Sequence, residues 1–94
     1  MNNPIQKVDI VIPVHNEELN LKILLPKIIN IVKKIKKFNI RIICIDDNSN
    51  DKTLIYLKLL KKRNKKIQFL TNNKKSGQTV CFKRYLKKFR SDYF

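Results

Sequence analysis

The sequence has one glycine, no alanine and no long apolar run, and these shortages exclude several classes of protein. With Gly77 as the only glycine, there is neither a GxGxxG nor a GxxxxGK[ST] motif, which disfavours dinucleotide oxidoreductases and P-loop NTPases. No apolar stretch approaches the roughly 20 residues that span a bilayer. Residues 1–7 contain no apolar segment typical of a secretory signal. We therefore expect a cytoplasmic protein.

Cysteine is also scarce. Cys44 and Cys81 lie among apolar neighbours, without CxxC spacing and without a nearby histidine cluster. This pattern predicts two buried thiols in a reducing compartment, and no zinc site.

Acidic residues are few, so the formal net charge is +15, with about +3 in residues 1–50 and about +12 in residues 51–94. Such an excess suits an anionic partner: nucleic acid, anionic lipid or a phosphorylated substrate. AT-rich coding is an alternative cause, because lysine, isoleucine and asparagine dominate the composition. The lysines are spread over helix faces with few aromatic residues between them, a pattern poor for base stacking. We therefore expect no nucleic-acid partner, although a basic module for nucleic acid or membrane surface stays the alternative.

The hydrophobic pattern predicts one α/β domain. Short β-branched runs at residues 8–14, 40–45 and 67–70 are typical of strands buried in a parallel sheet. Helical patterns separate and follow them, so the order is β-α-β-α-β-α, with right-handed crossovers.

Each predicted helix has an expected inward face or cap. The first helix places Leu21, Leu24, Leu25, Ile28, Ile31, Val32 and Ile35 on one face, with a kink or a fresh start at Pro26. The second runs from about residue 52 to 62, with Leu54, Leu57 and Leu60 inward; Ser49 or Asn50 can cap it, and Asp51 suits its dipole. The third runs over residues 78–89, with Phe82, Tyr85, Leu86 and Phe89 on one stripe.

Ligands of open α/β sheets bind beyond the carboxyl ends of the strands. This rule selects three loops, at residues 15–20, 46–51 and 71–77, and the unusual polar residues all fall within them.

Each loop has both functional and purely structural interpretations. Glu17 either complements the helix dipole or binds a ribose hydroxyl, whereas dipole complementation explains Glu18. Asp46 and Asp47 either accept the ring N–H of a base, help hold a divalent cation, or form a turn that caps the second helix. Gly77 precedes a helix whose free N–H groups can face phosphate, or it forms an ordinary turn.

Three segments, in order, carry a family resemblance. VDIVIPVHNEE at residues 8–18 resembles an opening strand with a P-x-[YH]-N-E turn. IICIDDNSNDKTL at 42–54 resembles a strand with D-D-[GN]-S-x-D-x-T. SGQTVCFKRYLKKFRSDYF at 76–94 resembles an S-G-Q-T helix followed by the G-D-Y that starts a strand. Together they resemble family 2 glycosyltransferases of the GT-A fold, especially the polyprenyl-phosphate sugar transferases related to dolichyl-phosphate mannose synthase.

The resemblance implies a Rossmann-like nucleotide-binding half-domain over residues 7–94, truncated, after a short tail at 1–6. It implies nucleotide-sugar binding by Pro13 and His15 along the base, Glu17 near the ribose, Asp47 at the base edge with Asp46 in support, and Gly77 near the diphosphate. His15 replaces the more usual tyrosine.

The resemblance also implies a function for the complete enzyme. It would transfer a sugar from a nucleoside diphosphate sugar to an acceptor such as a polyprenyl phosphate, at the cytoplasmic face of a membrane, using Mg²⁺ or Mn²⁺. The family's D-x-D metal motif, acceptor site and catalytic base would follow Asp92, so we expect no metal ligand and no catalytic residue within these 94 residues. We also expect the 94-residue chain alone to be inactive, as a fragment or truncated remnant of an enzyme.

Overall fold

The computed structural model describes residues 5–89, which alternate three strands and three helices as the sequence predicts. The strands are β1 (Gln6–Val14), β2 (Phe38–Asp46) and β3 (Ile67–Thr71); the helices are α1 (Glu18–Lys34), α2 (Thr53–Arg63) and α3 (Gln78–Phe89). The predicted strand start at residue 92 lies outside the described residues. All three strands are parallel, in the order β1-β2-β3, and Val14 pairs with Asp46, which pairs with Thr71. The predicted α/β Rossmann-like sheet is confirmed.

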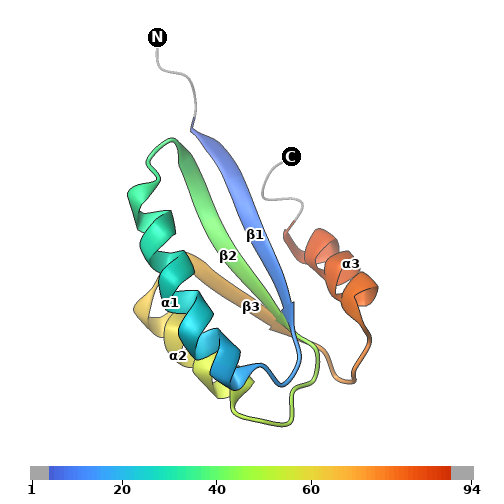
Figure 1. Ribbon diagram of the computed structural model, residues 1–94. Helices are drawn as coiled ribbons and strands as arrows, with labels where there is room; N and C mark the ends of the chain where they lie inside the picture. Colours follow the sequence, from blue (N-terminus) through green and yellow to red (C-terminus); the bar gives the residue numbers. More distant parts are fainter. Residues whose placement is uncertain (1–4, 90–94) are drawn as a thin grey trace.

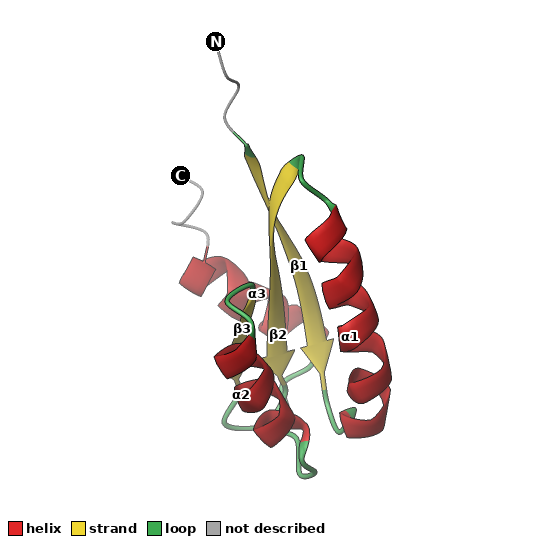
Figure 2. Ribbon diagram, turned by 90° about the vertical axis from the view of Figure 1, so that its left-hand side faces the viewer, coloured by secondary structure: helices red, strands yellow, loops and turns green. Residues whose placement is uncertain are grey.

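Helices cover both faces of the sheet, with α1 and α2 on one face and α3 on the other (Figures 1 and 2). The central strand β2 is buried on both sides and supplies both cores by alternation. Ile42 and Cys44 pack towards α1 and α2, whereas Ile43 and Ile45 pack towards α3. This two-sided burial explains why residues 42–45 of β2 are all apolar.

Both cysteines are buried and free, as predicted. Burial raises the pKa of the Cys44 thiol to about 12, and it is also the main reason why the pKa of Cys81 is raised. Both thiols therefore stay protonated at neutral pH.

The first helix differs from the prediction in the residues that it buries, and no new helix starts at Pro26. The helix continues through Pro26, because Pro26 lies on its exposed face, where water can satisfy the carbonyl that loses its partner. Leu24 and Ile31 are 46% and 60% exposed, and Ile29 packs against the core instead. A helix rich in isoleucine and leucine offers more than one apolar stripe, and only packing selects the buried one.

The buried face of α3 is also rotated about the helix axis relative to the predicted apolar stripe. Phe82 and Leu86 are 53% and 42% exposed, whereas Cys81, Tyr85 and Phe89 pack against the sheet. A polar contact helps to set this rotation, because the Tyr85 hydroxyl donates to Asp9 Oδ2 on β1 at 2.7 Å.

The same Asp9 carboxylate joins α3 to both long strands. Arg41 on β2 lies opposite Asp9 in the register and donates to its two oxygens, each at 2.9 Å. The Arg41 guanidinium lies 5.2 Å from the centre of the Phe89 ring. Asp9 has only 2% of its side chain exposed, so this bidentate pair and the tyrosine bond together offset the cost of burying the charge.

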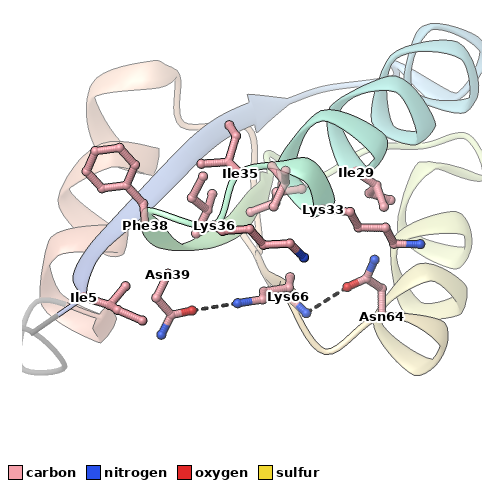
Figure 3. Close-up of a pocket in the computed structure, with 12 residues that line it drawn as sticks. Ile5, Ile29, Lys33, Ile35, Lys36, Phe38, Asn39, Asn64 and Lys66 are labelled. Atoms are coloured by element: carbon pink, nitrogen blue, oxygen red, sulfur yellow. Dashed lines mark hydrogen bonds between the residues drawn. The ribbon is translucent and has the colours of Figure 1, made fainter. Parts of the chain in front are cut away.

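The sheet has two functionally different edges. The carboxyl edge, where the strands end, carries the three loops, whereas the amino edge, where the strands begin, contains an open groove of about 610 Å³ (Figure 3). No helix within residues 5–89 is long and apolar enough to cross a bilayer.

The packing predicts a contrast between two leucines of α2. Leu57 is fully buried and Leu59 is 42% exposed. We expect Leu57→Ala to lower the free energy of unfolding by about 2–4 kcal/mol through lost burial and a cavity. Leu59→Ala changes the same atoms on the exposed side and should cost at most about 0.5 kcal/mol. Urea unfolding followed by circular dichroism measures both, and equal losses would contradict this assignment of the core.

Candidate nucleotide-binding edge

The carboxyl edge gathers every site residue predicted from the sequence. Pro13 lies near the end of β1, and His15 and Glu17 lie between β1 and α1. Asp46 ends β2, Asp47 follows it, and Gly77 precedes α3. Hydrogen bonds join these segments across 30 or more positions of the sequence. The edge is therefore a single structure, not three independent turns.

Asp47 is the centre of this structure. Its backbone N–H donates to Val14 O at 2.7 Å, and its carbonyl oxygen accepts from His15 Nδ1 at 2.7 Å. Because a carbonyl can only accept, His15 carries its proton on Nδ1. Asp47 thus fixes the ring of His15, which is half-buried.

The Asp47 carboxylate holds the third loop. Oδ1 accepts from the Asn72 side-chain amide at 2.7 Å and from Ser76 N at 2.8 Å, while Oδ2 accepts from Gly77 N at 2.9 Å. Asp47 is only 5% exposed. The bond from Asn72 is the largest cause that lowers the pKa of Asp47, and the backbone bonds from Ser76 and Gly77 lower it further.

Asp46 has a purely supporting position. It is 1% exposed, and its carboxylate accepts from Thr71 Oγ1 at 3.0 Å and from Ser49 N at 3.3 Å. It therefore joins the end of β2 to the end of β3.

Asn16, which was not predicted as a site residue, joins the first two loops by hydrogen bonds. Its side-chain oxygen accepts from Asn50 N at 2.7 Å and from Asp51 N at 3.3 Å, and its own backbone N–H donates to Ser49 Oγ at 2.9 Å. Asn16 has φ of 51°, a left-handed conformation that asparagine tolerates better than most residues. This tolerance is the sequence signal by which Asn16 could have been identified.

The cap of α2 differs from the prediction. Asp51, rather than Ser49 or Asn50, accepts from Thr53 N, at 2.9 Å, and Thr53 Oγ1 also donates to it. These bonds with Thr53 are the main reason why the pKa of Asp51 is lowered. The N-cap position itself is Lys52, without a side-chain capping bond, and Ser49 bonds to Asn16 instead.

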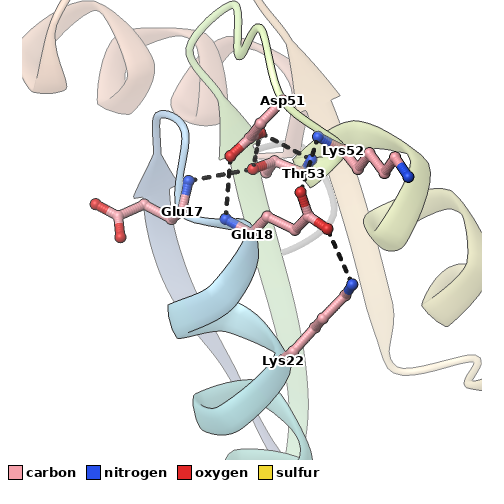
Figure 4. A network of polar contacts seen from close by, with 6 residues as sticks. All are labelled: Glu17, Glu18, Lys22, Asp51, Lys52 and Thr53. Carbon is pink, nitrogen blue, oxygen red and sulfur yellow. Dashed lines mark hydrogen bonds and ion pairs between the residues drawn. The ribbon is translucent and has the colours of Figure 1, made fainter.

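Glu17 and Glu18 have different surroundings (Figure 4). Glu18 joins two helix starts, because its carboxylate pairs with Lys22 at 2.9 Å and accepts from Lys52 N at 3.2 Å. The Lys22 bond is the main cause that lowers the pKa of Glu18. The Glu17 side chain points away from this network, and its carboxylate accepts from Asn20 at 2.7 Å. It lines a hollow of about 360 Å³ at the start of α1.

Gly77 has φ of +87°, which side-chain-bearing residues rarely adopt, and its carbonyl accepts from Cys81 N in the first turn of α3. Beside it lies a hollow of about 270 Å³ whose lining includes Lys74, Asn72 and Arg84. Arg84 donates to Thr71 O at 2.6 Å and to the Asn72 side-chain oxygen. Neither Asn72 nor Arg84 was predicted from the sequence as a site residue, although Asn72 directly follows β3.

A divalent cation does not fit the described part of this edge. No group of three or more histidine, cysteine, aspartate or glutamate side chains there could hold a metal ion. The carboxylates of Asp46 and Asp47 already accept from protein donors. We therefore assign no metal-dependent role to these residues.

Comparison with known proteins gives two matches. A sequence profile of glycosyl transferase family 2 matches residues 9–94. An uncharacterized glycosyltransferase of Synechocystis sp. is 32% identical over 75 residues, which cover 80% of this chain and 23% of that protein.

The geometry of Asp47 predicts how stability depends on pH. Its pKa lies below the ordinary 3.8 in the folded protein, so its bonds stabilise the fold above about pH 4, and this contribution is lost as pH falls through the folded pKa. Asp47→Asn should therefore lower the free energy of unfolding by on the order of 2 kcal/mol near neutral pH.

The difference between wild type and Asp47→Asn should shrink as the pH is lowered below about 4. Urea unfolding at several pH values measures it, and the contributions of Glu18 and Asp51 cancel because both proteins retain them. A difference that stays constant down to low pH would show that the carboxylate charge of Asp47 does not hold the loop.

Proposed function

Because this chain belongs to glycosyl transferase family 2, we propose that its carboxyl edge binds a nucleoside diphosphate sugar. The convergence of His15, Glu17, Asp47 and Gly77 at one edge of a parallel sheet supports this proposal most directly. The chain spans only 23% of its glycosyltransferase relative. The activity of the complete enzyme is therefore part of the proposal: transfer of the sugar to an acceptor, with a polyprenyl phosphate proposed from the motif resemblance.

We assign the nucleobase of the ligand to the region of Pro13, His15 and Asp47. The His15 ring is already oriented by its bond to the Asp47 carbonyl, which lowers the entropic cost of stacking a base on it. Asp47 Oδ2 accepts one bond in this structure, from Gly77 N, so it retains capacity for a second donor such as the ring N–H of uracil or guanine. Asp46 keeps the loop in place.

The positions that we propose for the ribose and the phosphates follow from that of the nucleobase. Glu17 directs its carboxylate out of the polar network, where it can accept from a ribose hydroxyl. Gly77 lies at the N-terminus of α3, next to exposed Lys74 and Lys75, and helix N-termini favour phosphate. No catalytic base is assigned to this chain, and its inactivity on its own stays a prediction.

The proposal predicts weak binding of UDP or GDP to the 94-residue chain, and a stronger dependence on Asp47 than on Asp51. Loss of a charge-assisted hydrogen bond in Asp47→Asn should reduce affinity by about tenfold or more. Asp51→Asn also removes a loop carboxylate, but that group caps α2, so the loss should be smaller. Calorimetric titration measures both, after circular dichroism has shown that each variant is folded.

Equal losses of affinity for the two variants would contradict the assignment of Asp47. Tighter binding of duplex DNA than of either nucleotide, at physiological salt, would favour a basic nucleic-acid module instead.

The role of Glu17 is tested by changing the ligand as well as the residue. Glu17→Gln should weaken UDP or GDP binding by about fivefold, since one charge-assisted bond to a ribose hydroxyl becomes neutral. The same variant should bind a 2′,3′-dideoxynucleoside diphosphate as well as the wild type does, because that ligand lacks both hydroxyls. Equal weakening for both ligands would show that Glu17 does not contact the ribose.

A further inference from the structure

The groove at the amino edge has a volume of about 610 Å³, and the proposed function does not use it. It lies where α1 ends and β2 begins, and Asn64 and Lys66, between α2 and β3, close one side (Figure 3). Its lining is largely apolar and comprises, among others, Ile29, Val32, Ile35, Phe38, Ile40 and Ile42. Ile35 and Phe38 are 37% and 40% exposed at its mouth.

Three lysines, Lys33, Lys36 and Lys66, line this apolar groove (Figure 3). All three are exposed, and none forms an ion pair within residues 5–89. The Lys66 amine donates to Asn39 Oδ1 at 2.7 Å, which leaves two of its N–H groups available. Like charges around one cavity repel one another, and an anion bound between them relieves this repulsion.

The surface around the groove is also positively charged. Residues 33–37 and 61–66 include nine lysines and arginines and no acidic residue. Complementation of the helix dipoles explains those in the last turns of α1 and α2. It does not explain Lys36 and Lys66, which follow the helix ends and face the groove.

We propose that this groove binds an anionic amphiphile, a molecule with one apolar chain and a phosphate or carboxylate head. The chain lies against Ile29, Ile35 and Phe38, and the head accepts from Lys33, Lys36 and Lys66. The volume falls within the range of about 300–1,000 Å³ typical of small-molecule sites. Ile42, the groove-lining residue nearest the carboxyl edge, lies four residues before Asp46 on β2, about 13 Å along the strand, and the groove shares no residue with the proposed nucleotide site.

The combination of linings selects this class of ligand. A free phosphate or a nucleic-acid backbone would use the lysines but leave the apolar lining exposed to water. A neutral hydrocarbon would cover the apolar lining but leave the three charges without a partner. Only a ligand with both parts satisfies both surfaces.

A tryptophan reporter tests the site, because the chain contains no tryptophan. Phe38→Trp places the fluorophore at the mouth of the groove, and Phe82→Trp places it on exposed α3 as the matched control. Dodecyl phosphate, titrated below its critical micelle concentration, should shift the emission of Phe38→Trp to the blue and saturate. Its affinity should exceed that of inorganic phosphate and of dodecyl maltoside by about tenfold or more. Calorimetry on the unaltered protein checks that the reporter does not create the site.

Charge reversal tests the head group. K33E/K36E/K66E should lose about tenfold or more in affinity for dodecyl phosphate, whereas K27E/K58E/K83E, with the same net charge and exposed positions, should retain it. If circular dichroism shows that the first variant is unfolded, K33Q/K36Q/K66Q replaces it, against K27Q/K58Q/K83Q. Affinity for UDP or GDP should stay unchanged in all of them, which separates this proposal from the proposed function.

Several results would overturn the proposal. These are equal losses in the two charge variants, equal blue shifts in Phe38→Trp and Phe82→Trp, and inorganic phosphate binding as tightly as dodecyl phosphate. Binding to anionic phosphatidylglycerol vesicles without binding of the free amphiphile would indicate a membrane-docking surface instead. Binding of duplex DNA through the same lysines, without amphiphile binding, would indicate a nucleic-acid surface.

Discussion

The three loops of the carboxyl edge depend on Asp47, which directly follows the central strand β2. Through its backbone it bonds to the end of β1 and to His15, and through its carboxylate it bonds to Asn72, Ser76 and Gly77. One residue thus connects all three loops at this edge of a small sheet. A buried carboxylate is costly unless its hydrogen bonds are satisfied, and these bonds both satisfy it and position the loops.

This arrangement changes how the acidic loop is understood. Two adjacent carboxylates at a strand end first indicate a ligand or a metal, but Asp46 and most of Asp47 are occupied by the protein itself. The structural and ligand-binding interpretations are therefore not exclusive for Asp47. Its bonds hold the loop of Gly77 near the loop of His15, and Oδ2 accepts only one of them, which is compatible with the proposed contact to a nucleobase.

The charges of the described chain are divided between the two edges of the sheet. Five of the six described acidic residues lie in the carboxyl-edge loops or at the start of α1, whereas Asp9 pairs with Arg41. Lysines and arginines gather at the amino edge, around an apolar groove. Parallel topology produces this separation, because it places all helix starts at one edge and all helix ends at the other.

The sequence by itself determined the order of elements, the parallel sheet and the edge on which Glu17, Asp47 and Gly77 meet. Buried runs, helical spacing and the direction of parallel strands are local or topological properties, so they can be inferred without coordinates. Tertiary structure decided the rest. It exposed Phe82 and Leu86, bonded Asp51 to the first N–H group of α2, and brought Arg84 against Thr71 and Asn72. These outcomes depend on helix rotation and on contacts between distant segments, and several rotations or caps are equally compatible with the same local pattern.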